Sequence, residues 1–160
     1  MSFSDNARKA QFLTSLKLGL VSPIRVSLKL IKFNIEMLAP SVNQYWVQSR
    51  QGGRFITPKG VEFKRLCQEA AIRHAISVPN DWANFALEVR IQLCSPNWFK
   101  KKGGINLRRG DIDNFGKSTI DSVFKALSPL DDAQVFRLLM EKAVISPNEP
   151  EHTIIEIRPL

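Results

Sequence analysis

The most constraining feature of this chain is a run in which apolar residues occupy every second position. The run spans residues 85 to 93, and its apolar members are Phe85, Leu87, Val89, Ile91 and Leu93. Successive side chains of a strand point to opposite faces, so this alternation predicts a half-buried β-strand whose apolar face is covered by another layer.

The rest of the chain predicts elements that supply this layer. Apolar residues recur at helical spacing in residues 58–76 and 114–127, and each segment is followed by a proline. The sequence pattern predicts further strands at residues 31–37, 134–145 and 153–158, and a loop at residues 40–54. The order β-α-β-α-β-β predicts an α+β fold with two helices packed on a small mixed sheet, in one domain over residues 31–160.

Residues 1–30 differ from this domain in composition. Residues 1–32 hold six basic side chains and a single acid, Asp5. Three interpretations remain open: a loosely ordered arm that contacts DNA, a targeting peptide, or sequence upstream of the true start. We favour a basic N-terminal extension that acts as an arm.

Net charge favours an anionic partner. The chain has 23 Lys and Arg against 15 Asp and Glu, a formal charge of +8. Nucleic acid therefore ranks ahead of a membrane surface, with an ordinary basic protein as the alternative. Cys67 and Cys94 are too few for a disulfide framework and read as buried free thiols of a reducing, cytoplasmic compartment. No apolar run approaches the roughly 20 residues of a membrane-spanning helix.

Two acidic groups stand out against this positive charge. Asp111 and Asp113 lie between two arginines and Lys117, and Asp131-Asp132 follow about eighteen positions later. Clustered carboxylates repel a polyanion unless a cation lies between them, and Mg²⁺ takes carboxylate and phosphate oxygens together. The combination is typical of phosphodiester cleavage.

Simpler interpretations of the same acids stay open. Asp113 or Asn114 could cap the second helix, and Asp131-Asp132 could be turn residues. The spacing by four of Asp113, Lys117, Asp121 and Lys125 is also that of a ladder of solvated ion pairs. On a helical wheel, however, Asp113 points toward the body of the fold, and an extended approach would turn Asp111 the same way.

Two segments combine basic residues with aromatic ones, which suits backbone neutralisation and base stacking. In the first, Trp98 and Phe99 precede the candidate DNA contacts Lys100, Lys101, Lys102, Arg108 and Arg109. The alternative is a solvated loop with Trp98 packed on the body. The second segment is a weaker candidate and contributes Asn43, Tyr45, Trp46, Arg50 and Arg54.

At these residues the chain resembles the RusA family of Holliday junction resolvases, from about Ile31 to Arg158. The strongest part is Asp111-Ile112-Asp113-Asn114 with Lys117, followed by Leu130-Asp131-Asp132-Ala133-Gln134-Val135. Pro40-Ser41-Val42-Asn43 and Tyr45 also resemble the family's pattern. Some members have a basic residue at the position of Gly110, so that phosphate contact is expected to move to Arg109.

The resemblance implies a homodimeric, Mg²⁺-dependent endodeoxyribonuclease of bacteria and their prophages, with Mn²⁺ as the alternative ion. Such an enzyme acts in recombination and repair by nicking four-way DNA junctions symmetrically. It implies metal ligation and catalysis by Asp111, Asp113 and Asp132, with Lys117 stabilising the transition state. Asp131 and Asp121 are implied as supporting acids.

Two points stay open at this stage. The chain between Asp113 and Asp132 is long enough to bring Asp132 back to Asp113 within one protomer. The alternative is that a partner subunit completes the site. The competing functions are a broader nuclease of flaps and other branched DNA, and a catalytically silent DNA-binding module.

Overall fold

A computed structural model of the chain describes residues 30–100, 102–106 and 109–160. The basic segment 1–29 and two of the predicted DNA contacts, Lys101 and Arg108, lie outside the described residues. None of the helices in the described part has both the length and the hydropathy needed to cross a membrane.

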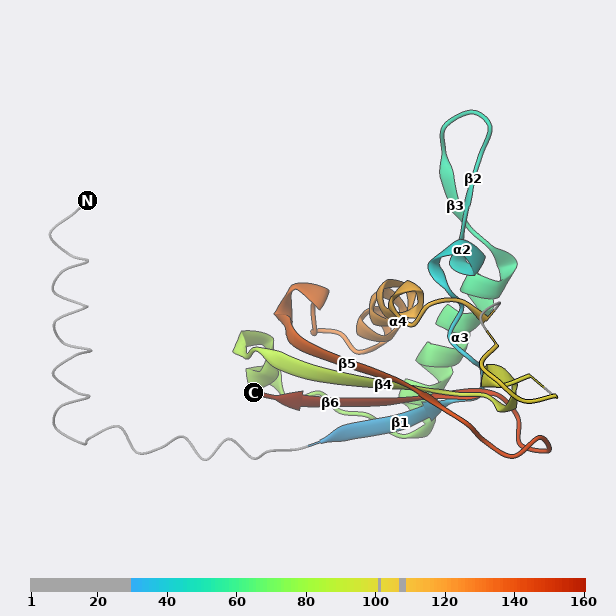
Figure 1. Cartoon of the computed structure of the whole chain (residues 1–160). Helices are drawn as coiled ribbons and strands as arrows, with labels where there is room; N and C mark the ends of the chain where they lie inside the picture. The colour runs from blue at the N-terminus through green and yellow to red at the C-terminus, as the bar shows by residue number, and fades with distance from the viewer. Residues whose placement is uncertain (1–29, 101, 107–108) are drawn as a thin grey trace, which may run out of the picture.

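A four-stranded sheet covered on one face by two helices forms the body (Figure 1). Its strand order is β1-β6-β4-β5; β4 and β5 are parallel, and the other pairs are antiparallel. This arrangement confirms the predicted α+β class. The bounds are β1 Ile31–Ile35, α3 Pro58–Arg73, β4 Leu87–Cys94, α4 Asp113–Ala126, β5 Val135–Ala143 and β6 His152–Pro159.

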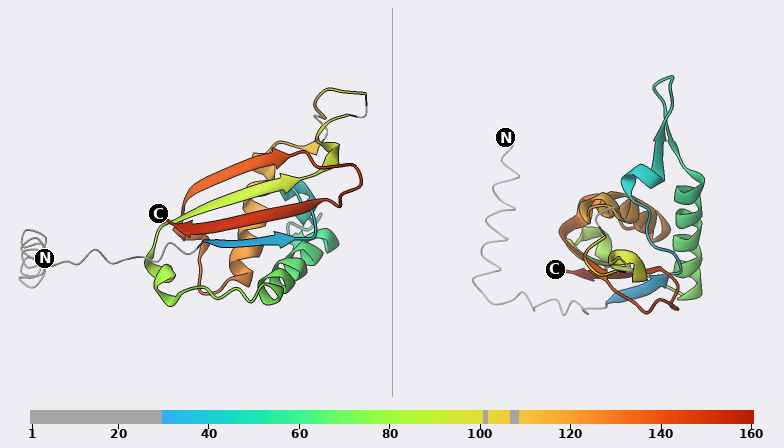
Figure 2. Two further views of the ribbon diagram at one scale, coloured as in Figure 1. Left: turned by 90° about the horizontal axis from the view of Figure 1, so that it is seen from below. Right: turned by 45° about the vertical axis from the view of Figure 1, so that its right-hand side comes forward.

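The parallel pair β4 and β5 is joined through α4, because parallel strands need a crossover connection. The register runs from Leu87 opposite Val135 to Cys94 opposite Ala143. Helix α4 must therefore run back along the sheet, from the Cys94 end to the Leu87 end. Viewed from below, the strands lie in front of the helices, with β5 as an outer strand (Figure 2).

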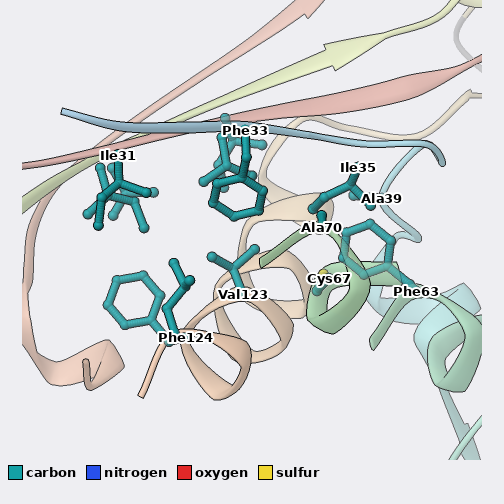
Figure 3. Close-up of a cluster of buried hydrophobic side chains, with 14 of the residues drawn as sticks. Ile31, Phe33, Ile35, Ala39, Phe63, Cys67, Ala70, Val123 and Phe124 are labelled. Carbon is teal, nitrogen blue, oxygen red and sulfur yellow. The ribbon is translucent and has the colours of Figure 1, made fainter. Parts of the chain in front are cut away.

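The core lies between the sheet and the two helices (Figure 3). The alternation that predicted β4 is confirmed, since Leu87, Val89, Ile91 and Leu93 are all at most 1% exposed. Cys67 and Cys94 are buried free thiols, also as predicted, and burial raises the pKa of Cys67 to about 12.

Residues 40–54 are more structured than predicted. They contain the helix α2 (Val42–Tyr45) and the strand β2 (Trp46–Gln48), which pairs with β3 (Arg54–Ile56). This hairpin projects away from the body (Figure 1). Three-residue strands are too short for a periodic pattern, which is why the sequence read as a loop.

Helix α3 packs closely on α2 at its first turn. Thr57 caps the helix by accepting a hydrogen bond from the Gly60 amide at 3.1 Å, and Pro58 occupies the position where a missing N–H costs nothing. A Cβ at Gly60 would lie 2.9 Å from the Tyr45 carbonyl oxygen and 2.7 Å from Ile56 Cγ2. Glycine thus permits this approach between α3 and the base of the hairpin.

The face of the sheet opposite the helices carries a cluster around Glu88. Glu88 is 1% exposed and forms ion pairs with Arg158 at 2.7 Å, Arg137 at 3.0 Å and Arg90 at 3.4 Å. Burial opposes ionisation of this carboxyl group, but the hydrogen bond from Arg137 and the charges of Arg158 and Arg137 outweigh it and hold the pKa below its usual value.

Candidate functional site

The first acidic group lies where the loop after β4 enters α4. Gly110 has φ +84°, a left-handed conformation that glycine adopts without strain, and it turns the chain into Asp111. The Gly110 carbonyl accepts a hydrogen bond from Lys142 Nζ at 2.6 Å, which ties the turn to the end of β5. Asp113 is the first residue of α4.

The approach to α4 differs from the predicted extended one. Ile112 is helical, with φ −64° and ψ −36°, and the Asn114 amide donates to the Asp111 carbonyl at 3.3 Å. Asp111 and Asp113 therefore flank one tight turn and do not share a face by alternation. Asp113 is exposed, although the helical wheel predicted that it points toward the body of the fold. It is exposed because it precedes the residues of α4 that pack on the sheet.

The simpler interpretations of Asp113 do not hold in the structure. The N-cap position of α4 is Ile112, and no side chain caps the helix. Among the described residues, no ion pair joins the members of the expected ladder, Asp113, Lys117, Asp121 and Lys125. Asp111, Asp113 and Lys117 are all exposed, and Lys117 follows Asp113 by one turn on the same helix face. The group is thus open to an external ligand.

The two aspartates of the second acidic group have different environments. Asp131 caps the 3₁₀ turn η4 (Asp132–Gln134): its Oδ1 accepts from the Ala133 amide at 2.9 Å, while Gln134 Oε1 accepts from the Asp131 amide at 2.8 Å. The structural interpretation is therefore confirmed for Asp131. Asp132 is exposed and makes no side-chain hydrogen bond or ion pair within the described part of the chain.

An open groove adjoins this second group. In this groove, Asp121 of α4 lies beside Asp131 and Asp132, together with basic and aromatic side chains. The residues that line the groove are Tyr45, Trp46, Lys64, Asp121, Phe124, Lys125, Leu130, Asp131 and Asp132. Asp121 thus lies with the second acidic group and not with the first.

The two acidic groups lie at opposite ends of the body. Asp113 begins α4 and Asp132 follows its end, and 14 residues of helix extend about 21 Å. The positions of the two groups along β5 lead to the same conclusion. Gly110 is hydrogen-bonded to Lys142 near the end of β5, whereas η4 immediately precedes the start of β5. Figure 1 shows the loop after β4 and the turn before β5 at opposite ends of the sheet. Within the described residues, no three His, Cys, Asp or Glu side chains converge as metal ligands.

The basic loop after β4 is only partly available to a ligand. Lys100, Lys102 and Phe99 are exposed. Trp98 is 4% exposed, and its indole donates to the Leu93 carbonyl at 2.8 Å, so the interpretation as a packed residue is confirmed and the stacking one is wrong. Arg109 is half-buried and pairs with Glu151 at 2.8 Å.

Glu151 holds this loop to the start of β6. Its carboxylate accepts hydrogen bonds from Ser95, Asn97 and Arg109. Partial burial opposes ionisation, but the hydrogen bonds from Ser95 and Asn97 and the charge of Arg109 outweigh it and hold the pKa of Glu151 below its usual value. Arg109 is thereby fixed beside the first acidic group.

The second candidate DNA-binding segment is the projecting hairpin and its base. Asn43, Arg50 and Arg54 are exposed, and the Arg54 guanidinium lies 5.1 Å from the centre of the Trp46 ring. Tyr45 does not belong to this surface: it is fully buried, and its hydroxyl is 3.0 Å from Ser122 Oγ of α4. Tyr45 instead anchors α2 to α4.

Several residues that shape these surfaces were not predicted. Lys142 positions Gly110, Glu151 positions Arg109, and Lys64 and Lys125 line the groove beside Asp132. Lys142 and Glu151 act across 32 and 42 positions of sequence, and no local pattern signals such pairs.

Comparison with known proteins places these features in a family. The family model described as Endodeoxyribonuclease RusA matches residues 38–158. The matched stretch includes both acidic groups, the hairpin, α3 and α4. None of the curated proteins compared with the chain matches it.

Proposed function

The chain belongs to the RusA family of endodeoxyribonucleases, and from this premise we propose that it resolves four-way DNA junctions by paired, symmetric phosphodiester hydrolysis that depends on Mg²⁺. The proposal includes action as a homodimer in recombination and repair. The substrate symmetry supports the dimer, since two matched nicks call for two sites related by a two-fold axis.

One observation carries the proposal beyond family membership. Asp111, Asp113 and Lys117 are exposed together at the start of α4, and none of them is used as a cap or an ion-pair partner in the described structure. Two exposed carboxylates and an ammonium group at the start of one helix are free to bind a hydrated divalent cation together with a phosphate. This argues against a silent module in which the acids only stabilise the fold.

The donor chemistry of this pair fits Mg²⁺. The ion prefers oxygen ligands and is commonly held by one or two carboxylates together with waters and substrate phosphates. Asp111 and Asp113 would supply two such carboxylates, whereas Asp132 is too far away to join them within one chain. When bound, the ion would neutralise phosphate charge and lower the pKa of the attacking water.

Lys117 acts on the same substrate group in this proposal. One turn beyond Asp113, its ammonium group can approach a phosphate held at the start of α4. There it stabilises the additional negative charge of the pentacovalent transition state or of the leaving oxygen. Replacing Lys117 by Met keeps much of the apolar stem and should lower the nicking rate on the order of 100-fold.

The remaining basic residues hold the DNA backbone. Lys100, Lys102 and Arg109 lie on the loop that leads to the first acidic group, and Arg50 and Arg54 lie on the hairpin. Such contacts position a duplex arm without reading its sequence.

The test is cleavage of a synthetic four-way junction beside a flap and a linear duplex, with Mg²⁺ and with EDTA. We expect paired nicks in the junction alone, abolished by EDTA. Asp113→Asn should lower the rate at least about 100-fold because several kcal/mol of transition-state stabilisation is lost. Glu62→Gln, which changes an exposed acid on α3 that pairs with Arg65 and belongs to neither acidic group, is the matched control.

Each other outcome contradicts part of the proposal. Comparable nicking of flaps would replace it with a broader branched-DNA nuclease. Tight junction binding without cleavage in Mg²⁺ or Mn²⁺ would support a DNA-binding module. Wild-type rates in Asp113→Asn would remove the first acidic group from the reaction.

A further inference from the structure

The two faces of the projecting hairpin differ in chemistry. The strand register pairs Val47 with Phe55 and Gln48 with Arg54. Residues directly across an antiparallel ladder share a face, and neighbours along a strand alternate between faces. Val47 and Phe55 therefore form one face, which we call the apolar face of the hairpin. Gln48 and Arg54 lie on the opposite face, where the Arg54 guanidinium also lies over the Trp46 ring.

The apolar face is open to solvent. Phe55 is 59% exposed and Val47 is 52% exposed. Figure 1 and the right-hand view of Figure 2 both show the hairpin standing clear of the sheet and the helices. Single exposed apolar residues are common on protein surfaces, but these two are adjacent and lie on a projection. The apolar face is thus available to a molecule outside the chain.

The ring of Phe55 is directed toward the tip of the hairpin. A Cβ at Gly53, two residues nearer the tip, would lie 3.1 Å from Phe55 Cζ and 3.2 Å from Phe55 Cε2. The absence of a side chain at Gly53 therefore lets the ring lie along the backbone there. The Ser49 amide donates to the Gly53 carbonyl at 2.7 Å and closes the loop at the tip. The ring is thus presented beside an ordered loop, at the end of the hairpin that meets a ligand first.

Contacts at the base hold the hairpin in place. An isolated two-stranded hairpin is only marginally stable in water, so its position depends on such contacts. The Thr57 amide donates to the Tyr45 carbonyl at 2.9 Å, and the Tyr45 hydroxyl lies 3.0 Å from Ser122 Oγ of α4. Trp46, the first residue of β2, also lines the groove beside Asp132. The apolar face therefore projects from an anchored base that adjoins the second acidic group.

DNA is the partner whose chemistry fits both faces of the hairpin. Arg50 and Arg54 are exposed and complement the charge of a phosphate backbone. An apolar side chain between such contacts can cover a base only where the base has an open face. In a continuous duplex every base pair is stacked on both sides. At the branch point of an unstacked junction, the last base pair of each arm has one open face, and aromatic or aliphatic side chains can cover such a face.

We infer that the apolar face of the hairpin covers the last base pair of an arm at the branch point, with the Phe55 ring stacked on it, and that this contact selects branched DNA over continuous duplex. The inference rests on the proposed function, which supplies branched DNA as the substrate. It gives the two faces different tasks. Arg50 and Arg54 hold any duplex arm, whereas Val47 and Phe55 bind only where stacking is interrupted.

The contact is tested by binding in EDTA, so that cleavage plays no part. The probe is a synthetic four-way junction with 2-aminopurine, a base whose fluorescence depends on its stacking, at the branch point. We expect wild type to change this fluorescence and to leave unchanged that of the same base in the middle of an arm. Phe55→Ser should abolish the change and lower junction affinity roughly 10-fold, while its affinity for a linear duplex stays that of wild type.

Further variants separate stacking from a general loss of structure. Phe55→Trp keeps an aromatic ring and should keep both the fluorescence change and the preference for the junction. Val47→Ser, on the other strand of the same face, should lower the preference in the same direction as Phe55→Ser. Ile72→Ser, at a residue that is 78% exposed on α3, is the control and should bind both DNAs as wild type does. Thermal midpoints close to that of wild type are expected for all four variants.

The outcomes distinguish this inference from the proposed function. A wild type that prefers the junction, beside a Phe55→Ser variant with the same preference and the same fluorescence change, would overturn the role of the apolar face and leave the proposed function standing. Equal loss of affinity for junction and duplex in Phe55→Ser would also overturn it, since the residue would then serve general DNA binding. A wild type without any preference for the junction would instead contradict the proposed function.

Discussion

At the scale of single residues, adjacent side chains of the same type have different roles. Asp131 is fixed in a reciprocal cap with Gln134, whereas the side chain of Asp132 beside it makes no hydrogen bond or ion pair within the described residues. Both positions are acidic in the family pattern, and only the geometry separates the carboxylate that caps a turn from the carboxylate that is left exposed.

This separation gives a prediction for Asp131 and Asp132. Asp131→Ala should lower the free energy of unfolding by about 1 kcal/mol, the usual cost of a lost cap, and leave substantial nicking. Asp132→Asn should leave the thermal midpoint unchanged and abolish nicking. Thermal unfolding and junction cleavage measured on both variants check this; the reverse assignment of effects would contradict it.

A second prediction concerns Glu88 and pH. Its pKa is lowered in the folded state, so its ionised form contributes stability above its unfolded pKa of about 4.3, and that contribution is lost as the pH falls through the folded value. Glu88→Gln should therefore lower the thermal midpoint at pH 7, and the difference from wild type should shrink toward pH 3.

The control for this change is Glu36→Gln, which removes an exposed ion pair with Arg73 and should alter the midpoint little. A difference for Glu88→Gln that is constant from pH 7 to pH 3 would show that the arginine cluster does not act through charge.

At the scale of elements, the strands and helices with long periodic patterns were predictable from the sequence. The segments for β4 and α4 were each within two residues of the observed bounds, because apolar spacing reports which face is buried. The hairpin was not predictable in this way, because β2 and β3 have only three residues each. The two strands are held by pairing with each other and by the turn at Gly52, which has φ +90°.

The close packing between α2 and α3 predicts the effect of a single methyl group. In Gly60→Ala the Cβ meets the Tyr45 carbonyl, which is backbone and gives way little. We expect a loss of stability of about 1–3 kcal/mol in denaturant unfolding, despite the better helix propensity of alanine. Val61→Ala, at a neighbouring position of α3 that is 56% exposed, is the control; equal stabilities of the two variants would contradict the packing argument.

The hairpin predicts a change in DNA affinity without a change in chemistry. Arg50→Ala with Arg54→Ala should weaken junction binding and reduce the salt dependence of the binding constant by about 0.9 per lost phosphate contact. Nicking at saturating DNA should be retained. Arg65→Ala is the control because that guanidinium is occupied by Glu62 and Glu69. An unchanged affinity of the double variant would remove the hairpin from the interface.

At the scale of the whole molecule, the family resemblance proposed Asp111, Asp113, Lys117 and Asp132 as site residues, and the sequence predicted a helix between the two acidic groups. It left open whether the chain returns Asp132 to Asp113; in the structure, the 14 residues of α4 place the two groups at opposite ends of the body. The relative direction of α4 and β5 follows from the parallel pairing of β4 with β5, which depends on long-range register. The exposed edge of β5 likewise emerges only once the strand order is known.

The most direct measurement of the central claim is cleavage of a supercoiled plasmid that extrudes a cruciform, with products separated as linear and nicked circular DNA. Two symmetric nicks in one bound complex yield linear DNA, whereas a single nick releases the supercoiling and yields a nicked circle. We expect wild type with Mg²⁺ to yield linear DNA, and Asp113→Asn to leave the plasmid supercoiled. Nicked circles from the wild type, or no cleavage at all, would contradict a paired junction-resolving activity.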